Sequence, residues 1–314
     1  MSDARHAEQT FHTPTPVLPS FDYVRPASPQ EATRLLLKGD GQARLFMGGT
    51  DVFVRMRDGF ITPKILVDMK RLPGMTQVEF GKRKGLIVGA AVDMNSLARH
   101  PAVIEHYPVL AEALHTVASY QLRTRATMGG NLCNASPAAD TAPAALVLEA
   151  NLILHGRRGE RVVPITEFFL GPGKTAIKSG EFLLRIEIPP APKGAVGRYL
   201  KLGRNTLGDL AIVGVAVLGY PDPQGGSSRK KAKSGYRFRI ALASVAPVPI
   251  RVPKAEAILA ASPITPDVIE AAAQAAMETA KPIDDVRSSA AYRKAMVKNL
   301  TRRAVTAVWE QLEQ

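Results

Sequence analysis

Two glycine-pair loops, each followed by a helix-forming segment, constrain this chain more than any other feature. The first reads GGTD at residues 48–51, and the second lies within residues 127–140 and carries the pair at 129–130. Glycines at such places let backbone N–H groups approach an anion closely, and a helix that starts there adds a favourable dipole. Neither loop fits the Walker or the GxGxxG pattern, because no GK[ST] or third spaced glycine follows.

The second loop is long, nearly free of charge and built from small residues. It offers the hydroxyls of Thr127 and Ser136, the amides of Asn131 and Asn134, and the carboxylate of Asp140. Such a loop suits a polar, phosphate-bearing ligand that is held by backbone amides, with the carboxylate bound to a sugar hydroxyl. Two alternatives stay open on composition alone: a tight turn at the first loop, and a polar surface loop with a helix cap at the second.

Composition narrows the function classes. The 314 residues allow two or three domains, and 46% hydrophobic with 22% charged residues is typical of a soluble globular protein. The single cysteine, Cys133, excludes an internal disulfide and any cluster built on several thiolates. The histidines show no metal-ligand spacing, so no metal site is expected. No signal peptide or membrane-spanning run is visible, which predicts a cytoplasmic protein.

The net charge of +13 is concentrated in two windows, 223–240 and 286–305, which hold six cations each and no acid. These windows fit either solvated surface or a docking surface for acidic partners. Nucleic acid is not expected as a partner, because the two windows hold few of the aromatic residues that stack bases.

The pattern of elements predicts an α+β chain. We expect a flexible arm at 1–19, a first module at 20–190 with subdomains at 20–75 and 76–190, and a C-terminal domain at 196–312. The first module is predicted to contain a β–loop–α–β unit at 44–68, a helix at 103–118 and a hairpin at 151–165. Antiparallel strands followed by two helices are expected in the C-terminal domain.

At this point a family resemblance becomes specific. The segments FMGGTDV (46–52) and TMGGNLCNASPAAD (127–140) resemble the two flavin-contacting motifs of the FAD-binding medium subunit of molybdenum hydroxylases, the xanthine dehydrogenase and carbon monoxide dehydrogenase group. The likeness runs in order through nearly all of residues 20–310 and ends at 286–293. It lies near the hydroxybenzoyl-CoA reductase beta-subunit branch, but the four-cysteine insertion of that branch is missing. Cys133 is therefore expected to be a buried small residue near the ligand.

The resemblance implies a two-subdomain PCMH-type (vanillyl-alcohol-oxidase-like) FAD-binding module, followed by a C-terminal α+β domain with an antiparallel sheet and helices. It also assigns residues to parts of the FAD. The residues that it implies are Met47, Gly48, Gly49, Thr50, Asp51 and Val52 for the pyrophosphate, Thr127, Gly129, Gly130, Asn131 and Asn134 for the diphosphate and ribityl region, Asp140 for adenosine or ribityl hydroxyls, Leu183 or Leu184 beside a ring, Lys201 near the flavin, and Asp209 beyond a one-residue insertion.

The implied function is electron transfer inside a heteromeric enzyme. Substrate is oxidised at a molybdopterin centre in a large subunit, and electrons pass through [2Fe-2S] clusters of a small subunit to FAD in this chain, then to an external electron acceptor. A dimer of heterotrimers is expected, with no catalytic acid or base in this chain. Two alternatives are a non-redox basic scaffold that docks acidic partners and a stand-alone FAD-dependent oxidase. The second fits poorly, because neither glycine loop holds a histidine for flavin attachment.

Overall fold

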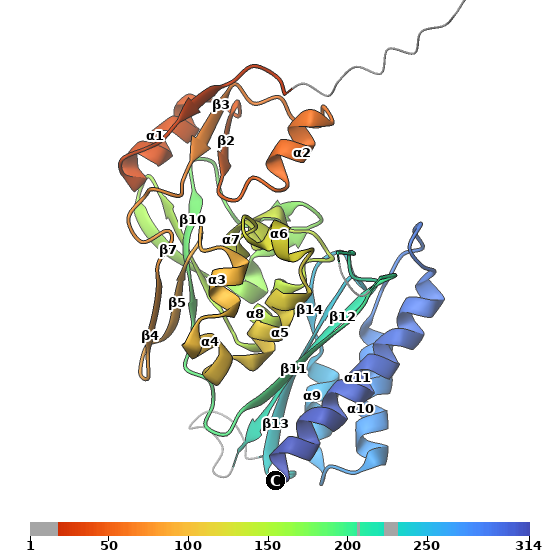
Figure 1. Ribbon diagram of the computed structural model, residues 1–314. Helices are drawn as coiled ribbons and strands as arrows, with labels where there is room; N and C mark the ends of the chain where they lie inside the picture. The colour runs from red at the N-terminus through yellow and green to blue at the C-terminus, as the bar shows by residue number, and fades with distance from the viewer. Residues whose placement is uncertain (1–17, 206–207, 223–231) are drawn as a thin grey trace, which may run out of the picture.

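The computed structural model describes residues 18–205, 208–222 and 232–314, which build three larger sheets arranged along the molecule and a two-stranded sheet, β8-β9 (Figure 1). The lobe at the top of the view holds a parallel sheet in the order β1-β3-β2. Its elements are β1 (Asp22–Val24), α1 (Pro29–Lys38), β2 (Ala43–Phe46), α2 (Val52–Arg57) and β3 (Ile65–Asp68). The β–loop–α–β unit predicted at 44–68 is confirmed, because β2 and β3 pair in parallel with α2 between them.

Helix α1 begins with a cap formed by side chains. Ser28 is the N-cap and its Oγ accepts a hydrogen bond from the backbone of Glu31 at 3.2 Å, while Pro29 takes the first helical position. The Glu31 carboxylate accepts a hydrogen bond from the N–H of Ala27 at 2.7 Å, one residue before the N-cap. Two donors at the start of the helix are thus satisfied by side chains.

The middle lobe holds an antiparallel sheet in the order β4-β5-β10-β6-β7 and a group of short helices. Its elements are β4 (Val78–Gly81), β5 (Gly85–Gly89), α3 (Met94–Ala98), α4 (Pro101–His106), α5 (Pro108–Thr116), α6 (Tyr120–Arg123), α7 (Met128–Asn134), α8 (Thr141–Val147), β6 (Asn151–Gly156), β7 (Gly159–Pro164), η1 (Ile165–Glu167), β8 (Phe169–Gly171), β9 (Lys174–Thr175) and β10 (Phe182–Ile188). The predicted hairpin at 151–165 is confirmed as β6 paired with β7.

The single helix predicted at 103–118 is wrong, because the structure divides this segment into α4 and α5. Pro108 has no N–H to donate and begins the second helix, so the first one ends before it. Tyr107 at the break is fully buried, and its hydroxyl donates to the carbonyl oxygen of Pro189 at 3.1 Å. Regular apolar spacing runs across the break and therefore hides it.

The C-terminal part holds an antiparallel sheet in the order β11-β12-β13-β14 with three helices against it. Its elements are β11 (Val196–Leu202), β12 (Val213–Pro221), β13 (Tyr236–Ala243), β14 (Ile250–Arg251), α9 (Pro253–Ala261), α10 (Pro266–Thr279) and α11 (Ala290–Leu312). Thr265 and Ser289 cap the two long helices, which correspond to the two predicted helices, whereas α9 and β14 were not predicted.

This sheet is buried on both faces. Along β12, Val213, Val215 and Val217 join the core formed with α9, α10 and α11. The alternate residues Ala216 and Leu218 belong to the core of the middle lobe. The α+β class is confirmed, and the middle and C-terminal parts share this sheet as their common wall.

Some predictions fall outside the described residues. They concern most of the N-terminal arm, residues 1–17, and part of the first basic window, residues 223–231. Within the described ranges, none of the helices combines the length and the apolar character needed to cross a bilayer.

Candidate functional site

A cavity of about 690 Å³ lies where the three lobes meet, within the usual size range of ligand sites. Its wall is formed by both glycine loops, the segment around α6, the start of β10 and residues 208–210. The predicted site residues that line it are Met47, Gly48, Gly49, Thr50, Asp51, Val52, Thr127, Gly130, Asn131, Asn134, Asp140, Leu183 and Asp209. Gly129, Leu184 and Lys201 are not part of this wall.

The first glycine loop leaves its backbone donors free. Within the described part of the chain, the N–H groups of residues 48–51 have no hydrogen-bond partner. Gly49 has a φ of +79°, a conformation that side-chain-bearing residues rarely adopt. A Cβ at Gly48 would overlap the carbonyl oxygen of Arg125, so the two loops approach each other too closely for any other residue here. Four adjacent free donors beside a cavity are suited to an anion.

Lys70 supports this loop from behind. Its Nζ donates to the carbonyl oxygen of Met47 at 3.0 Å, pairs with Asp68 Oδ1 at 2.7 Å, and lies 4.2 Å from the centre of the Phe46 ring. Burial alone would raise the pKa of Asp68, but hydrogen bonds from Lys70 and Tyr23 outweigh it and hold the pKa below its ordinary value. The carboxylate therefore stays charged and keeps Lys70 in place.

The second glycine pair was predicted to form an open loop. In the structure it forms the first turn of helix α7 instead. Thr127 is the N-cap, with its Oγ1 accepting from the Gly130 N–H at 2.9 Å and its carbonyl oxygen accepting from Asn131 at 3.0 Å. A Cβ at Gly129 would overlap the backbone of Ala90, so this glycine serves packing. Glycine is a poor helix former, but its cost is offset here by the cap and by the close approach that it permits.

A side-chain contact joins the two loops across the cavity. Asn134 Nδ2 donates to Asp51 Oδ1 at 3.2 Å, at the end of α7 and the start of α2. Cys133 lies next to this contact and lines the cavity, as the resemblance suggested. Burial raises the pKa of its thiol to about 12, so the thiol remains protonated and is not a nucleophile at neutral pH.

Asp140 connects the cavity to the C-terminal sheet. Its Oδ1 accepts from the hydroxyl of Tyr199 at 2.7 Å and its Oδ2 from Lys201 Nζ at 2.8 Å. Both partners lie on the edge strand β11, two residues apart and hence on the same face. Burial raises the pKa of Asp140, with Lys201 and Tyr199 opposing the change, and burial beside Asp140 raises the pKa of Tyr199 well above its ordinary value.

The sequence analysis missed Tyr199, although strand alternation with Lys201 could have found it. The structure also separates three predicted residues from the cavity wall. Lys201 lies behind Asp140 and donates to the carbonyl oxygen of Thr116 at 2.9 Å. Leu184 sits at a register shift in β10, which leaves Leu183 as the lining residue of that pair.

The apolar part of the wall was also missed, because ordinary core residues in a sequence look the same as residues beside a ligand. It includes Phe46, Met94, Val117, Leu122 and Phe182. Asp209 does line the cavity, and its carboxylate accepts hydrogen bonds from the backbone of Arg204 at 2.8 Å and of Leu210 at 2.9 Å. In the described ranges, no group of three or more His, Cys, Asp or Glu side chains could hold a metal ion.

Comparison with known protein families matches both halves of the chain to families of known type. Residues 19–191 match the FAD binding domain in molybdopterin dehydrogenase, and residues 198–308 match the CO dehydrogenase flavoprotein C-terminal domain. The chain belongs to this family. It is the FAD-binding subunit of a heteromeric molybdenum hydroxylase, as the resemblance of its glycine motifs indicated.

Individual members of the family are similar over almost their whole length. The carbon monoxide dehydrogenase medium chain of Hydrogenophaga pseudoflava is 33% identical over 93% of this chain and 98% of its own length. The putative xanthine dehydrogenase FAD-binding subunit of Escherichia coli is 30% identical over 90% and 94%. The solved carbon monoxide dehydrogenase of Hydrogenophaga pseudoflava superimposes with a TM-score of 0.85 at 34% identity, covering 94% of this chain and 99% of that chain.

The residues present fit FAD. Its pyrophosphate needs backbone donors that are not already used, and residues 48–51 offer four of them at a place where a Cβ on Gly48 would not fit. Its rings need an apolar wall, which Phe46, Leu122 and Phe182 help to form. The cavity also has the size expected for a large ligand.

Proposed function

We propose that this subunit receives electrons from [2Fe-2S] clusters of a small partner subunit and releases them to an external electron acceptor. A large partner subunit would hold the molybdopterin centre, and the complex would be a dimer of heterotrimers. The names of the relatives support such an assembly, since they are medium chains or FAD-binding subunits of larger dehydrogenases. The observation that carries the proposal is the row of free N–H groups at 48–51, which faces α7 across one cavity.

The first glycine loop would hold the pyrophosphate. Residues 48–51 donate backbone N–H groups, and the Thr50 hydroxyl, which has no partner among the described residues, can add a further hydrogen bond. Across the cavity, Asn131 and Asn134 present amides from α7. Neutral donors of this kind bind an anion without bringing a mobile cation into the site.

FAD, when bound, supplies the redox chemistry, because it can take up and release electrons singly or in pairs. The chain's own residues set its surroundings. Lys201 pairs with Asp140 at 2.8 Å, so the carboxylate at the wall is neutralised from behind and no free cation lies at the wall. We therefore expect Lys201 to act through the orientation of Asp140, and Asp140 to offer its remaining lone pairs to a ligand hydroxyl.

No side chain of this subunit needs to move a proton for electrons to enter. The protonated thiol of Cys133 contributes only packing beside the ligand. The cytoplasmic location expected from the sequence stays a prediction, as does the identity of the acceptor.

A flavin spectrum separates this function from the basic-scaffold alternative. Purified chain should absorb near ~450 nm, directly or after incubation with FAD. Thr50→Ala should reduce the affinity for FAD, while the matched control Thr76→Ala should leave it unchanged, because Thr76 is exposed and does not line the cavity. Wild-type chain that never binds FAD would contradict the proposal and favour the scaffold.

The electron-transfer part needs its own measurement. The chain with bound FAD is mixed with the reduced [2Fe-2S] subunit of its complex, and the loss of flavin absorbance is followed in a stopped-flow instrument. We expect bleaching in this mixture. A flavin that stays oxidised beside the reduced iron–sulfur subunit, but is bleached by chemical reductants, would refute the assigned electron donor.

A further inference from the structure

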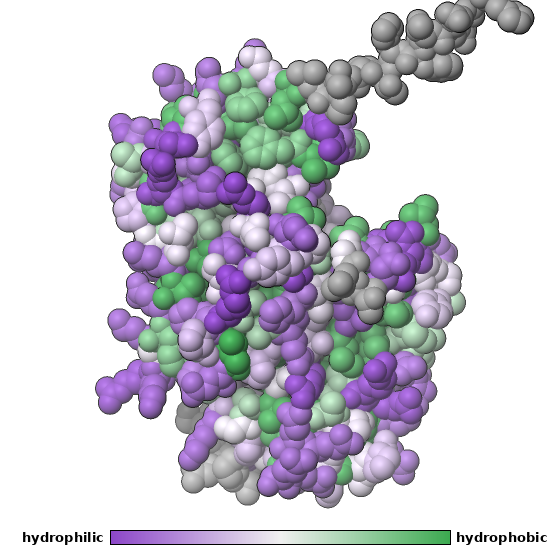
Figure 2. All heavy atoms as spheres, viewed as in Figure 1, coloured by the Kyte–Doolittle hydropathy of each residue, from purple (hydrophilic) through white to green (hydrophobic). Residues whose placement is uncertain are grey.

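Exposed apolar side chains border the mouth of the cavity. Leu210, with 57% of its surface accessible, and the exposed Leu122 both line the cavity and also face solvent. Next to Leu210, the loop joining α10 and α11 exposes Ile283 and Val286, at 72% and 96%. Figure 2 shows the tip of this loop as an apolar projection beside the notch that separates it from the lobe carrying α2. Apolar groups gathered from several segments on one rim mark an interaction site.

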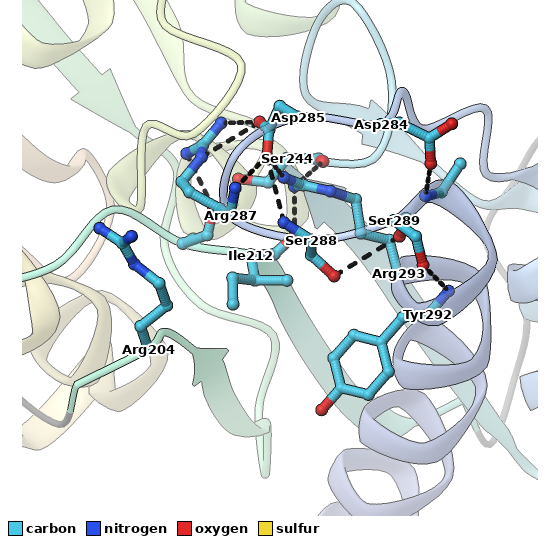
Figure 3. Close-up of polar contacts among 12 residues, drawn as sticks. Arg204, Ile212, Ser244, Asp284, Asp285, Arg287, Ser288, Ser289, Tyr292 and Arg293 are labelled. Carbon is cyan, nitrogen blue, oxygen red and sulfur yellow. Dashed lines mark hydrogen bonds and ion pairs between the residues drawn. The ribbon is translucent and has the colours of Figure 1, made fainter.

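The loop that carries Val286 is firmly held. Asp285 pairs with Arg287 at 2.6 Å and with Arg293 at 2.7 Å, and its backbone and that of Ser288 exchange hydrogen bonds (Figure 3). Arg287 Nη1 also reaches the carbonyl oxygen of Ala211, directly after Leu210, at 3.4 Å. A surface valine at the tip of a loop with this many polar contacts is presented in one fixed place.

The same contacts tie the tip to the cofactor cavity. Arg293, at 1% exposure, donates to the carbonyl oxygens of Ile212 at 2.8 Å and Ser244 at 3.1 Å (Figure 3). Ser244 in turn donates its N–H to the carbonyl oxygen of Pro137, within the second glycine segment, at 2.7 Å. The exposed tip and the wall of the cavity therefore form one rigid unit.

Charges near the tip differ from what the sequence suggests. Arg287 and Arg293 of the basic window both form ion pairs with Asp285, and Lys298 pairs with Glu270 at 2.8 Å. Arg204, next to the rim, keeps 57% of its side chain exposed. The rim thus combines an apolar centre with one exposed cation, Arg204, whose Nε lies 3.4 Å from Asp209, and an apolar centre with a polar border is typical of a specific protein interface.

We infer that Leu122, Leu210, Ile283 and Val286 form the docking surface for the [2Fe-2S] subunit, which would receive Val286 in an apolar hollow with carboxylates at its border. The inference rests on the proposed function and adds the surface to it. Transfer of an electron between two bound centres requires them to lie close together. The subunit that holds the donor therefore has to cover the mouth of the flavin cavity, and these residues form that rim.

The test uses the wild-type chain with bound FAD, the double variant Ile283→Ser/Val286→Asp and a matched control, Val162→Asp. Val162 is 60% exposed on the edge strand β7, away from the cavity wall. Binding of the [2Fe-2S] subunit and of the large subunit is measured separately. We expect the double variant to bind the [2Fe-2S] subunit at least about tenfold more weakly, as for central apolar interface residues, while the control binds normally.

Flavin absorbance shows whether each variant is folded, and Val286→Ser alone provides a milder change if the double variant loses FAD. Wild-type affinity of both tip variants for the [2Fe-2S] subunit would overturn the inference. Weakened binding of the large subunit alone would overturn it as well, because the tip would then belong to another interface. Failure of the wild-type chain to bind FAD or any iron–sulfur subunit is a different result, which would contradict the proposed function itself.

Discussion

In the described structure, residues 48–51 leave four backbone N–H groups without partners, whereas Gly130 and Asn131 donate theirs to Thr127 at the start of helix α7. The letters are almost the same, GGTD and TMGGN, and both pairs lie on one cavity. In the first loop the glycines permit a positive φ at Gly49 and a close approach at Gly48. In the second, Gly129 fits against Ala90 and Gly130 is bound by the cap.

The difference shows that a glycine pair does not define a binding loop by itself. The first pair leaves backbone donors beside the cavity, and the second makes room for a helix whose side chains line that cavity. Their supports differ too, since the first loop is held by Lys70 within its own lobe. The second is held from the C-terminal part, through Tyr199 and Ser244.

The largest effect is expected from the first pair. Gly48→Ala places a methyl group on the carbonyl oxygen of Arg125 and should lower the free energy of unfolding by about 3 kcal/mol and abolish FAD binding. Gly130→Ala meets only the Thr127 Oγ1, at 2.9 Å, and should cost less than about 1 kcal/mol, because alanine favours the helix. Urea denaturation with flavin absorbance measures both. Equal losses at the two positions would remove the distinction between the pairs.

The next largest effect is expected at Asp285, which holds Arg293 and through it the second loop, and its contribution to stability depends on pH. Asp285→Asn leaves the buried Arg293 without its counter-charge and should destabilise the protein by about 2 kcal/mol at neutral pH. Hydrogen bonds from Arg287 and Arg293 hold the pKa of Asp285 below its usual range, so its stabilisation is present above about pH 4 and is lost as pH falls toward the folded-state pKa. The difference between wild type and variant should therefore shrink on acidification. A difference that stays constant down to pH 2 would argue against this role.

Tyr199→Phe tests the other support of the second loop. It removes the hydroxyl that donates to Asp140 at 2.7 Å and should cost about 1 to 2 kcal/mol, because a buried carboxylate oxygen loses its partner. Tyr292→Phe is the control, since Tyr292 is exposed on α11. Thermal unfolding of both variants suffices, and an unchanged midpoint for Tyr199→Phe would mean that this contact adds nothing to stability.

The two threonines give the smallest and most direct contrast. Thr127→Ala removes the N-cap of α7 and should cost about 1 kcal/mol of stability. Thr50→Ala removes a hydroxyl with no partner in the described structure, so stability should stay within about 0.5 kcal/mol while FAD binds more weakly. Calorimetric titration with FAD, combined with denaturation, separates the two effects. Loss of stability without loss of affinity at Thr50 would reverse the roles of the loops.

Much of the fold could be predicted, because caps, hairpins and apolar strands leave local marks in the sequence. Caps of this kind are Ser28, Thr265 and Ser289, whose side chains begin α1, α10 and α11. The break at Pro108 and the helix at 128–134 were missed, since apolar spacing continues through the first and glycines disguise the second. Tertiary packing decided both.

For the site, the motifs indicated the residues but not their arrangement. Lys201 was expected near the flavin, which stays a prediction; its contact with Asp140 was not foreseen, because β11 belongs to a sheet that docks from the other half of the chain. A contact between residues so far apart in sequence leaves no local pattern. Tyr199 was missed for the same reason.

The C-terminal sheet, with both faces covered, has a consequence for how the chain can be divided. The two family matches meet between residues 191 and 198, but the hydrophobic core is continuous across this boundary. A fragment beginning at 198 would expose Tyr199, Ala216, Leu218 and Ala241 to water. In the complementary N-terminal fragment, the helices α5 and α8 would lose the surface that they pack against. The two sequence families therefore share one folding unit in this chain. The half that binds the nucleotide and the half that presents Val286 should unfold in a single cooperative transition.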